Sequence, residues 1–104
     1  MSAFLVQILL PVYDGAGKRF AAGLYSQVAR ELTERFGGVT AYSRAPAKGL
    51  WKPAPRRTTR DDIVVYEVMV QGLEAPWWSR YRAALERRFR QDELVVRAHA
   101  IRRL

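Results

Sequence analysis

Five side chains in this sequence could together support acid–base or anion-binding chemistry. Gln7, Tyr42, Glu67, Arg97 and His99 lie in separate segments of the 104-residue chain, and each falls in a strand-like stretch. A carboxylate and an imidazole in one pocket can exchange a proton with a bound molecule. An arginine beside them can hold an anion. The set predicts a small polar cavity if the fold brings the five residues to one surface.

The same residues also have a purely structural interpretation. A buried charge needs a partner whether or not it does chemistry, so Glu67 and Arg97 can form an ion pair while His99 makes a hydrogen bond at an interface. The sequence leaves both interpretations open. It therefore leaves open whether the protein is an enzyme.

Composition excludes several other kinds of chemistry. The chain has no cysteine, and His99 is its single histidine. Thiolate nucleophiles, disulfides, zinc–thiolate sites and multi-histidine metal sites are therefore excluded. The glycine-containing segment 13–18 lacks the G-x-x-x-x-G-K-[ST] spacing of a phosphate-binding loop, and we interpret it as a turn. We expect no metal and no cofactor.

Length and hydropathy predict a single domain, covering residues 1–104. No apolar run approaches the roughly 20 residues that span a bilayer, because the run from Phe4 to Val12 is short and contains Gln7. That run also lacks a basic leader region and a small-residue cleavage site. We expect a cytoplasmic protein without a membrane segment.

A basic segment holds most of the formal net charge of +8. Residues 44–60 read RAPAKGLWKPAPRRTTR, with six Lys/Arg, no acid and three prolines. A connection this long is typical of a binding loop or an extended hairpin arm. Its candidate phosphate contacts are Lys52, Arg56, Arg57 and Arg60, beside Trp51, which could stack on a base. We expect a kinked hairpin arm first, and phosphate contact as its second use.

Binding of nucleic acid through a sheet face is not expected. RNA-recognition modules stack bases on aromatic residues of two central strands. Here the corresponding strand positions carry no aromatic residue, and Glu67 stands near their centre. An acid there would repel phosphate.

The order of the elements predicts the fold. Strand-like segments at Phe4–Val12, Val39–Arg44, Asp62–Gln71 and Leu94–Ile101 alternate with two amphipathic helical stripes. The first stripe runs from Phe20 to Phe36 and ends at Gly37-Gly38, and the second runs from Pro76 to Gln91. This β-α-β-β-α-β order predicts an α+β ferredoxin-like sandwich, with an antiparallel sheet of order 4-1-3-2 and both helices on one face.

Strand alternation assigns an almost wholly apolar set of side chains to the face under the helices. The opposite face mixes apolar residues such as Leu5, Leu9 and Met69 with the five polar candidates. A mixed face of this size normally marks an interface or a ligand cleft. We therefore expect a homodimer in which two open faces enclose a dimeric α/β barrel.

The chain resembles a family of short uncharacterised bacterial proteins with ferredoxin-like folds. The resemblance rests on VQILLPVYDGAGK near the start, GGVTAYSRAPAKGLWK in the middle and YRAALERRFRQDELVVR near the end. It implies the fold and a dimer, and it implies no activity. It also implies that residues 50–52 resume strand structure after a kink.

Three functions follow from these expectations. The first is a homodimer whose inter-sheet cavity holds a small, anionic molecule. The second is a cofactor-independent dimeric-barrel enzyme that uses His99 and Glu67 as acid and base. The third is phosphate or nucleic-acid contact through the basic hairpin at 44–60.

Overall fold

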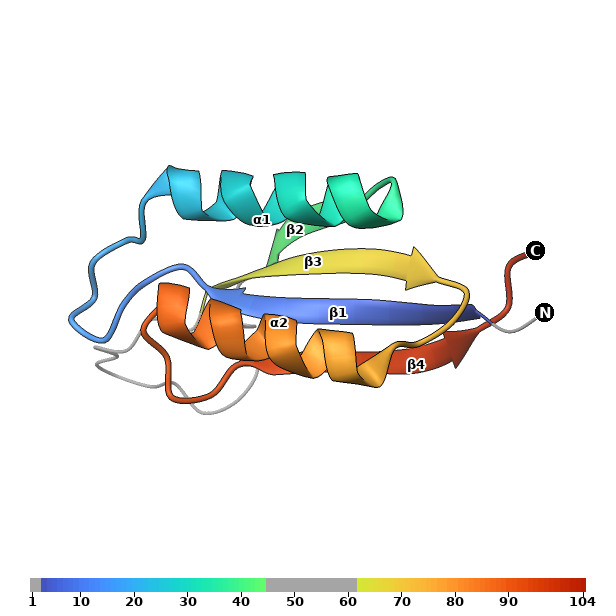
Figure 1. Cartoon of the computed structure of the whole chain (residues 1–104). Coiled ribbons are helices and arrows are strands. Elements are labelled where there is room, and N and C mark those ends of the chain that lie inside the picture. The colour runs from blue at the N-terminus through green and yellow to red at the C-terminus, as the bar shows by residue number, and fades with distance from the viewer. Residues whose placement is uncertain (1–2, 45–61) are drawn as a thin grey trace, which may run out of the picture.

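The computed structural model describes residues 3–44 and 62–104. The elements in chain order are β1 (Ala3–Pro11), α1 (Ala22–Phe36), β2 (Thr40–Arg44), β3 (Ile63–Val70), α2 (Ala75–Arg88) and β4 (Val95–Ile101). All three strand pairs are antiparallel, and the sheet order is β2-β3-β1-β4. Both helices cover the same face of the sheet (Figure 1). The predicted ferredoxin-like fold is confirmed, since this order is 4-1-3-2 counted from the other edge.

The two central strands alternate between the core and the open face as the sequence predicts. On β1, Val6, Ile8 and Leu10 are almost completely buried under the helices, whereas Gln7 and Leu9 between them point to the other side. Neighbours along a strand point to opposite faces, so one register fixes every side chain. The register places Gln7 opposite Glu67 on β3 and opposite Arg97 on β4.

Helix α1 begins two residues later than the apolar stripe. Phe20 is buried, but its backbone N–H donates to the carbonyl of Val12, which ties it to the end of β1 and keeps it outside the helix. At the other end Gly37 adopts φ 87° and donates its N–H to Thr33 O at 2.8 Å. The predicted left-handed glycine cap is therefore confirmed.

Helix α2 is shorter than predicted. The apolar stripe suggests a helix through Gln91, but the helix ends at Arg88. Arg90 takes a left-handed backbone conformation with φ 50°, and the N–H of Gln91 then bonds to Glu86 O at 2.9 Å. This closure keeps Phe89 fully buried while it turns the chain toward β4.

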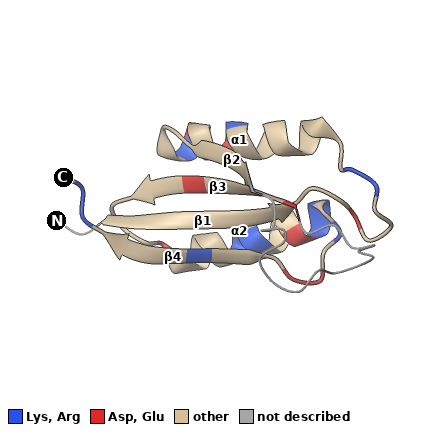
Figure 2. Ribbon diagram, turned by 180° about the vertical axis from the view of Figure 1, so that it is seen from behind, with Lys and Arg blue, Asp and Glu red and all other residues tan. Residues whose placement is uncertain are grey.

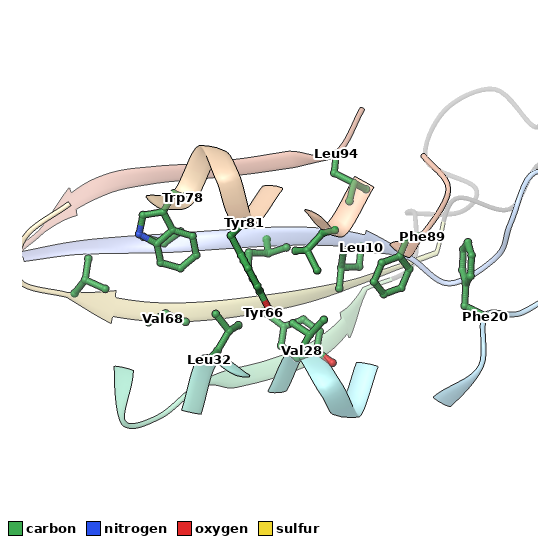
Figure 3. Close-up of a cluster of buried hydrophobic side chains, with 14 residues drawn as sticks. Leu10, Phe20, Val28, Leu32, Tyr66, Val68, Trp78, Tyr81, Phe89 and Leu94 are labelled. Carbon is green, nitrogen blue, oxygen red and sulfur yellow. The ribbon is translucent and has the colours of Figure 1, made fainter. Parts of the chain in front are cut away.

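The core lies between the helices and the sheet (Figure 3). Phe89 packs its ring edge against Phe20, with ring centroids 5.2 Å apart, and Tyr66 of β3 points from the sheet toward α1. Trp78 is 5% exposed, whereas the neighbouring Trp77 is only partly buried. The core thus fills the helix side of the sheet, and Gln7, Glu67 and Arg97 on the opposite, open face are not part of it.

Candidate functional site on the open sheet face

The open face carries a row of polar side chains that crosses the sheet. Thr40 of β2, Glu67 of β3, Gln7 of β1 and Arg97 of β4 occupy one level of the strand register. Seen from behind, the sheet shows an acidic position on β3 and a basic position on β4, either side of β1 (Figure 2). We call these four residues, together with Tyr42, the polar row.

Hydrogen bonds link most of the polar row. Gln7 Nε2 donates to Glu67 Oε2 at 2.8 Å, and the hydroxyl of Tyr42 donates to the same oxygen at 3.0 Å. Arg97 Nε donates to Gln7 Oε1 at 2.9 Å. Tyr42 reaches Glu67 along the diagonal of the β2–β3 pair, a neighbour relation that long side chains can bridge.

Glu67 and Arg97 are joined through Gln7 and not by a direct ion pair. Within residues 3–44 and 62–104 no ion pair between the two is found, because the amide of Gln7 stands between them and bonds to both. This leaves bonding capacity unused on each side. Among the described residues, Glu67 Oε1 accepts no hydrogen bond and the two Nη atoms of Arg97 donate none.

His99 lies outside this network. It stands on β4 opposite Leu5, one level away from Arg97 on the same face. Strand spacings of ~4.8 Å and a rise of ~3.3 Å per residue put its Cα about 12 Å from that of Glu67. Since the Glu67 carboxylate is held by Tyr42 and Gln7, it is no direct hydrogen-bond partner of His99. The five predicted residues share one face, but they do not form an acid–base pair within one chain.

Apolar residues flank the polar row on both sides. One neighbouring level holds Leu9, Val65 and Val95, and the other holds Leu5, Met69 and His99. Met69 is 55% exposed and Val95 is 49% exposed, although Val65 is buried. The polar row therefore lies within a partly exposed apolar surface.

A second polar cluster, which the sequence does not reveal, joins the two helices. Arg88 of α2 donates from both Nη atoms to the two oxygens of Glu31 of α1, at 2.8 and 2.9 Å. The Tyr81 hydroxyl donates to the same carboxylate at 2.8 Å, and Gln27 Nε2 does so at 3.3 Å. We call Glu31, Tyr81 and Arg88 the helix clip. Its members lie 50 and 57 positions apart, so no local spacing could have indicated it.

The helix clip shifts the acidity of its members. Burial raises the pKa of Glu31, but the hydrogen bonds from Arg88 and Tyr81 and the charge of Arg88 outweigh burial and hold it below its ordinary value of 4.5. Burial and the neighbouring carboxylate raise the pKa of the Tyr81 hydroxyl strongly. A tyrosine with that shift stays protonated and acts as a donor, so the clip is a structural link between helices.

A groove lies on the helix side of the sheet, between α2 and the edge strand β4. Its volume is 180 Å³. The lining residues come from β1, the turn before α2, α2 itself and β4: Val6, Leu73, Ala75, Trp78, Ser79, Arg82, Val96, Arg97 and Ala98. No sequence pattern predicted this groove, because it depends on how far α2 covers β4.

The described residues were searched for metal-ligand clusters and for membrane-spanning helices. Within 3–44 and 62–104 no group of three or more His, Asp or Glu side chains could hold a metal ion. In the same part of the chain no helix combines the length and hydropathy needed to cross a bilayer. The candidate phosphate contacts Lys52, Arg56, Arg57 and Arg60 lie outside the described residues.

Comparisons with protein-family models, with curated proteins and with solved structures found no match to this chain. The class of protein therefore rests on the fold: a ferredoxin-like α+β domain with an open, mixed sheet face. The resemblance to short bacterial proteins stays a prediction.

Proposed function

We propose that this chain functions as a homodimeric domain in which the open sheet face of one copy packs on that of a second. The observation that carries the proposal is the unused bonding capacity of the polar row. Glu67 Oε1 has no donor and the Arg97 Nη atoms have no acceptor among the described residues. Both groups lie on a face where apolar side chains are also exposed.

The register supplies a self-complementary arrangement. Glu67 and Arg97 stand at one level, one strand to either side of Gln7. A two-fold axis along β1 would exchange these sides, so that Glu67 of each copy meets Arg97 of the other. The same axis would place Met69 over His99 of the second copy and Leu5 over Leu5. Opposite charges and apolar rows would each find a matching partner.

Ordinary sheet packing accommodates this arrangement. Face-to-face sheets lie about 10 Å apart with nearly aligned strands. A glutamate and an arginine that extend toward each other can bridge that gap. Three overlapping strands of about seven residues cover roughly 14 by 23 Å per copy, about 330 Å² in projection. That is small beside the ~800 Å² of accessible surface per partner in a stable complex, so we expect a weak dimer at micromolar concentration.

Mixing two charge-reversal variants tests the proposal. Glu67→Arg would set two arginines against each other in its own dimer, and Arg97→Glu would set two glutamates against each other. A mixed dimer of the two variants restores both opposite-charge pairs. We expect each variant alone to sediment as a monomer at concentrations where the unsubstituted chain dimerises, and the mixture to dimerise.

The mixing experiment separates contacts between copies from contacts within one copy. Arg80→Glu reverses a charge on the exposed side of α2, away from the open face, and serves as a control that should leave dimerisation unchanged. Circular dichroism confirms that each variant is folded. A monomeric unsubstituted chain, or a mixture no more dimeric than its components, would refute the proposal.

A second candidate function is binding of a small anion between the two sheets. The feature that favours it is Arg97, which has no acidic partner within the described residues. An anion held by Arg97 would take the place of Glu67 from the second copy. Native mass spectrometry distinguishes the two, because a dimer with twice the chain mass supports direct pairing and an added small mass supports the anion. Glu67 and His99 do not contact each other within one chain, so the geometry gives no support to an enzyme that uses them as a direct acid–base pair.

A further inference from the structure

His99 stands near the middle of the face that the proposed homodimer buries. It lies on β4 opposite Leu5 of β1, and Leu5 stands opposite Met69 of β3. This level of the register lies between the polar row and the level at which Ala3 and Ile101 stand opposite each other. In the single chain His99 is exposed. A second copy packed on this face would therefore cover an imidazole that the single chain leaves in water.

The two-fold arrangement surrounds His99 with apolar groups. Leu5 is its neighbour on its own sheet, and the axis along β1 would place Met69 of the second copy over it. Neither side chain carries a charge, and a thioether is only a weak hydrogen-bond acceptor. A neutral imidazole can be buried between such groups, whereas a protonated imidazole would lose its water without gaining a partner.

The two charged groups nearest to His99 are paired with each other in the proposed dimer. Arg97 precedes His99 by two residues on the same face of β4. Glu67 of the second copy would bond to this Arg97, one level away from His99. The two opposite charges then largely cancel at the imidazole, so burial against apolar side chains decides which form of His99 the dimer favours.

The remaining neighbours offer no further acid to a protonated His99. Strand β1 contains no ionisable residue. Tyr42 of β2 lies two levels away, and its hydroxyl already donates to Glu67. Arg102 and Arg103 follow β4 and carry the same sign as a protonated imidazole. Both helices lie on the opposite face of the sheet (Figure 1).

We propose that protonation of His99 in mild acid dissociates the homodimer, so that the open face carries a pH switch. The proposal rests on the proposed homodimer and adds a way of regulating it. Histidine is the side chain that ordinarily gains its charge between about pH 8 and pH 5. Carboxylates gain protons only around pH 4, so the ion pairs between the copies are not what titrates in this range.

Sedimentation equilibrium at pH 7.5 and at pH 5.5, at one ionic strength, measures the dissociation constant of the dimer. The free chain binds the proton more readily than the dimer does, so acid favours the free chain. A roughly threefold effect at each of the two copies of His99 multiplies, and we expect the dissociation constant to rise about tenfold at pH 5.5. Circular dichroism at both pH values confirms that the chain stays folded.

His99→Gln keeps a polar side chain that cannot gain a charge. This variant should dimerise with the same dissociation constant at both pH values. A pH effect that survives in His99→Gln would assign the effect to another group and overturn the proposal.

Met69→Glu should reverse the sign of the pH effect. The new carboxylate would face His99 of the second copy, so protonation of His99 would create an ion pair and acid should tighten the dimer. Val95→Glu is the matched control, because Val95 is 49% and Met69 55% exposed on the same face, but Val95 lies two levels from His99. The Val95→Glu dimer should still weaken in acid.

The outcomes separate the switch from the homodimer itself. An unsubstituted chain that is monomeric at both pH values would refute the homodimer and the switch with it. A dimer whose dissociation constant is unchanged or lower in acid would refute the switch and leave the homodimer standing. A Met69→Glu dimer that weakens in acid as much as the Val95→Glu dimer would show that Met69 does not face His99, which would also overturn the switch.

Discussion

Removal of the Glu31 carboxylate is expected to destabilise the fold by more than an ordinary surface substitution. Glu31→Ala leaves the Tyr81 hydroxyl, on a residue 9% exposed, without its acceptor, which costs about 1–2 kcal/mol. It also removes a two-pronged pair with Arg88, whose side chain is 25% exposed, for about 1 kcal/mol. We expect the free energy of unfolding to fall by about 2–3 kcal/mol at neutral pH.

Urea denaturation followed by circular dichroism measures this loss. Protein concentration is held constant, because association would shift the apparent stability. Glu34→Ala is the control, since Glu34 is exposed on the same helix and its side chain makes no hydrogen bond among the described residues. Adding Tyr81→Phe to the Glu31→Ala chain removes the unpaired hydroxyl and should recover about 1 kcal/mol.

The pH dependence gives the sign of the effect. The folded-state pKa of Glu31 lies below the ordinary value of 4.5, so its charge stabilises the fold above that pH. This contribution is lost as the pH falls through the folded-state pKa. The stability difference between the unsubstituted chain and Glu31→Ala should therefore shrink in acid. A difference independent of pH, or a loss equal to that of Glu34→Ala, would refute the assigned role of the helix clip.

Two further predictions concern packing and helix ends. Leu32 is fully buried in the core, so Leu32→Ala should lower the free energy of unfolding by about 3 kcal/mol. In a thermal scan this loss should lower the Tm by roughly 15 °C. A shift of only a few degrees would contradict the placement of Leu32 in the core. In urea denaturation, Gly37→Ala should destabilise the fold by about 1 kcal/mol, because Gly37 has a left-handed backbone with φ 87°. Gly23→Ala should stabilise the fold by about 0.5–1 kcal/mol, because alanine favours the helix and nothing lies within 4 Å of the added Cβ. The same sign for both variants would show that the cap geometry is wrong.

The fold could be predicted from the sequence because its signals are local. Three signals each depend on neighbours within a few positions: the alternation in β1 and β3, the apolar residues that recur every four positions along α1, and the glycine cap at Gly37. The end of α2 was predicted too late, because Phe89 continues the apolar stripe after the backbone has already left the helix. An apolar stripe marks burial, and a residue beyond the helix can be buried as well.

The candidate site was only partly predictable. Alternation was enough to put Gln7, Glu67 and Arg97 on the open face. Alternation could not predict which of these residues stand opposite one another, because that depends on the register of neighbouring strands, which is fixed when the core packs. The register brought Gln7 between the acid and the base, and it left His99 one level away.

By itself the sequence determined the order of strands and helices, the face of each strand residue and the absence of thiol chemistry, because each follows from residue type or short-range periodicity. Tertiary structure alone decided the hydrogen bonds of the polar row, the helix clip and the groove beside β4. These join residues dozens of positions apart, and their geometry is fixed by strand register and by the position of the helices over the sheet. No spacing along the chain encodes such distances, so only the folded chain shows them.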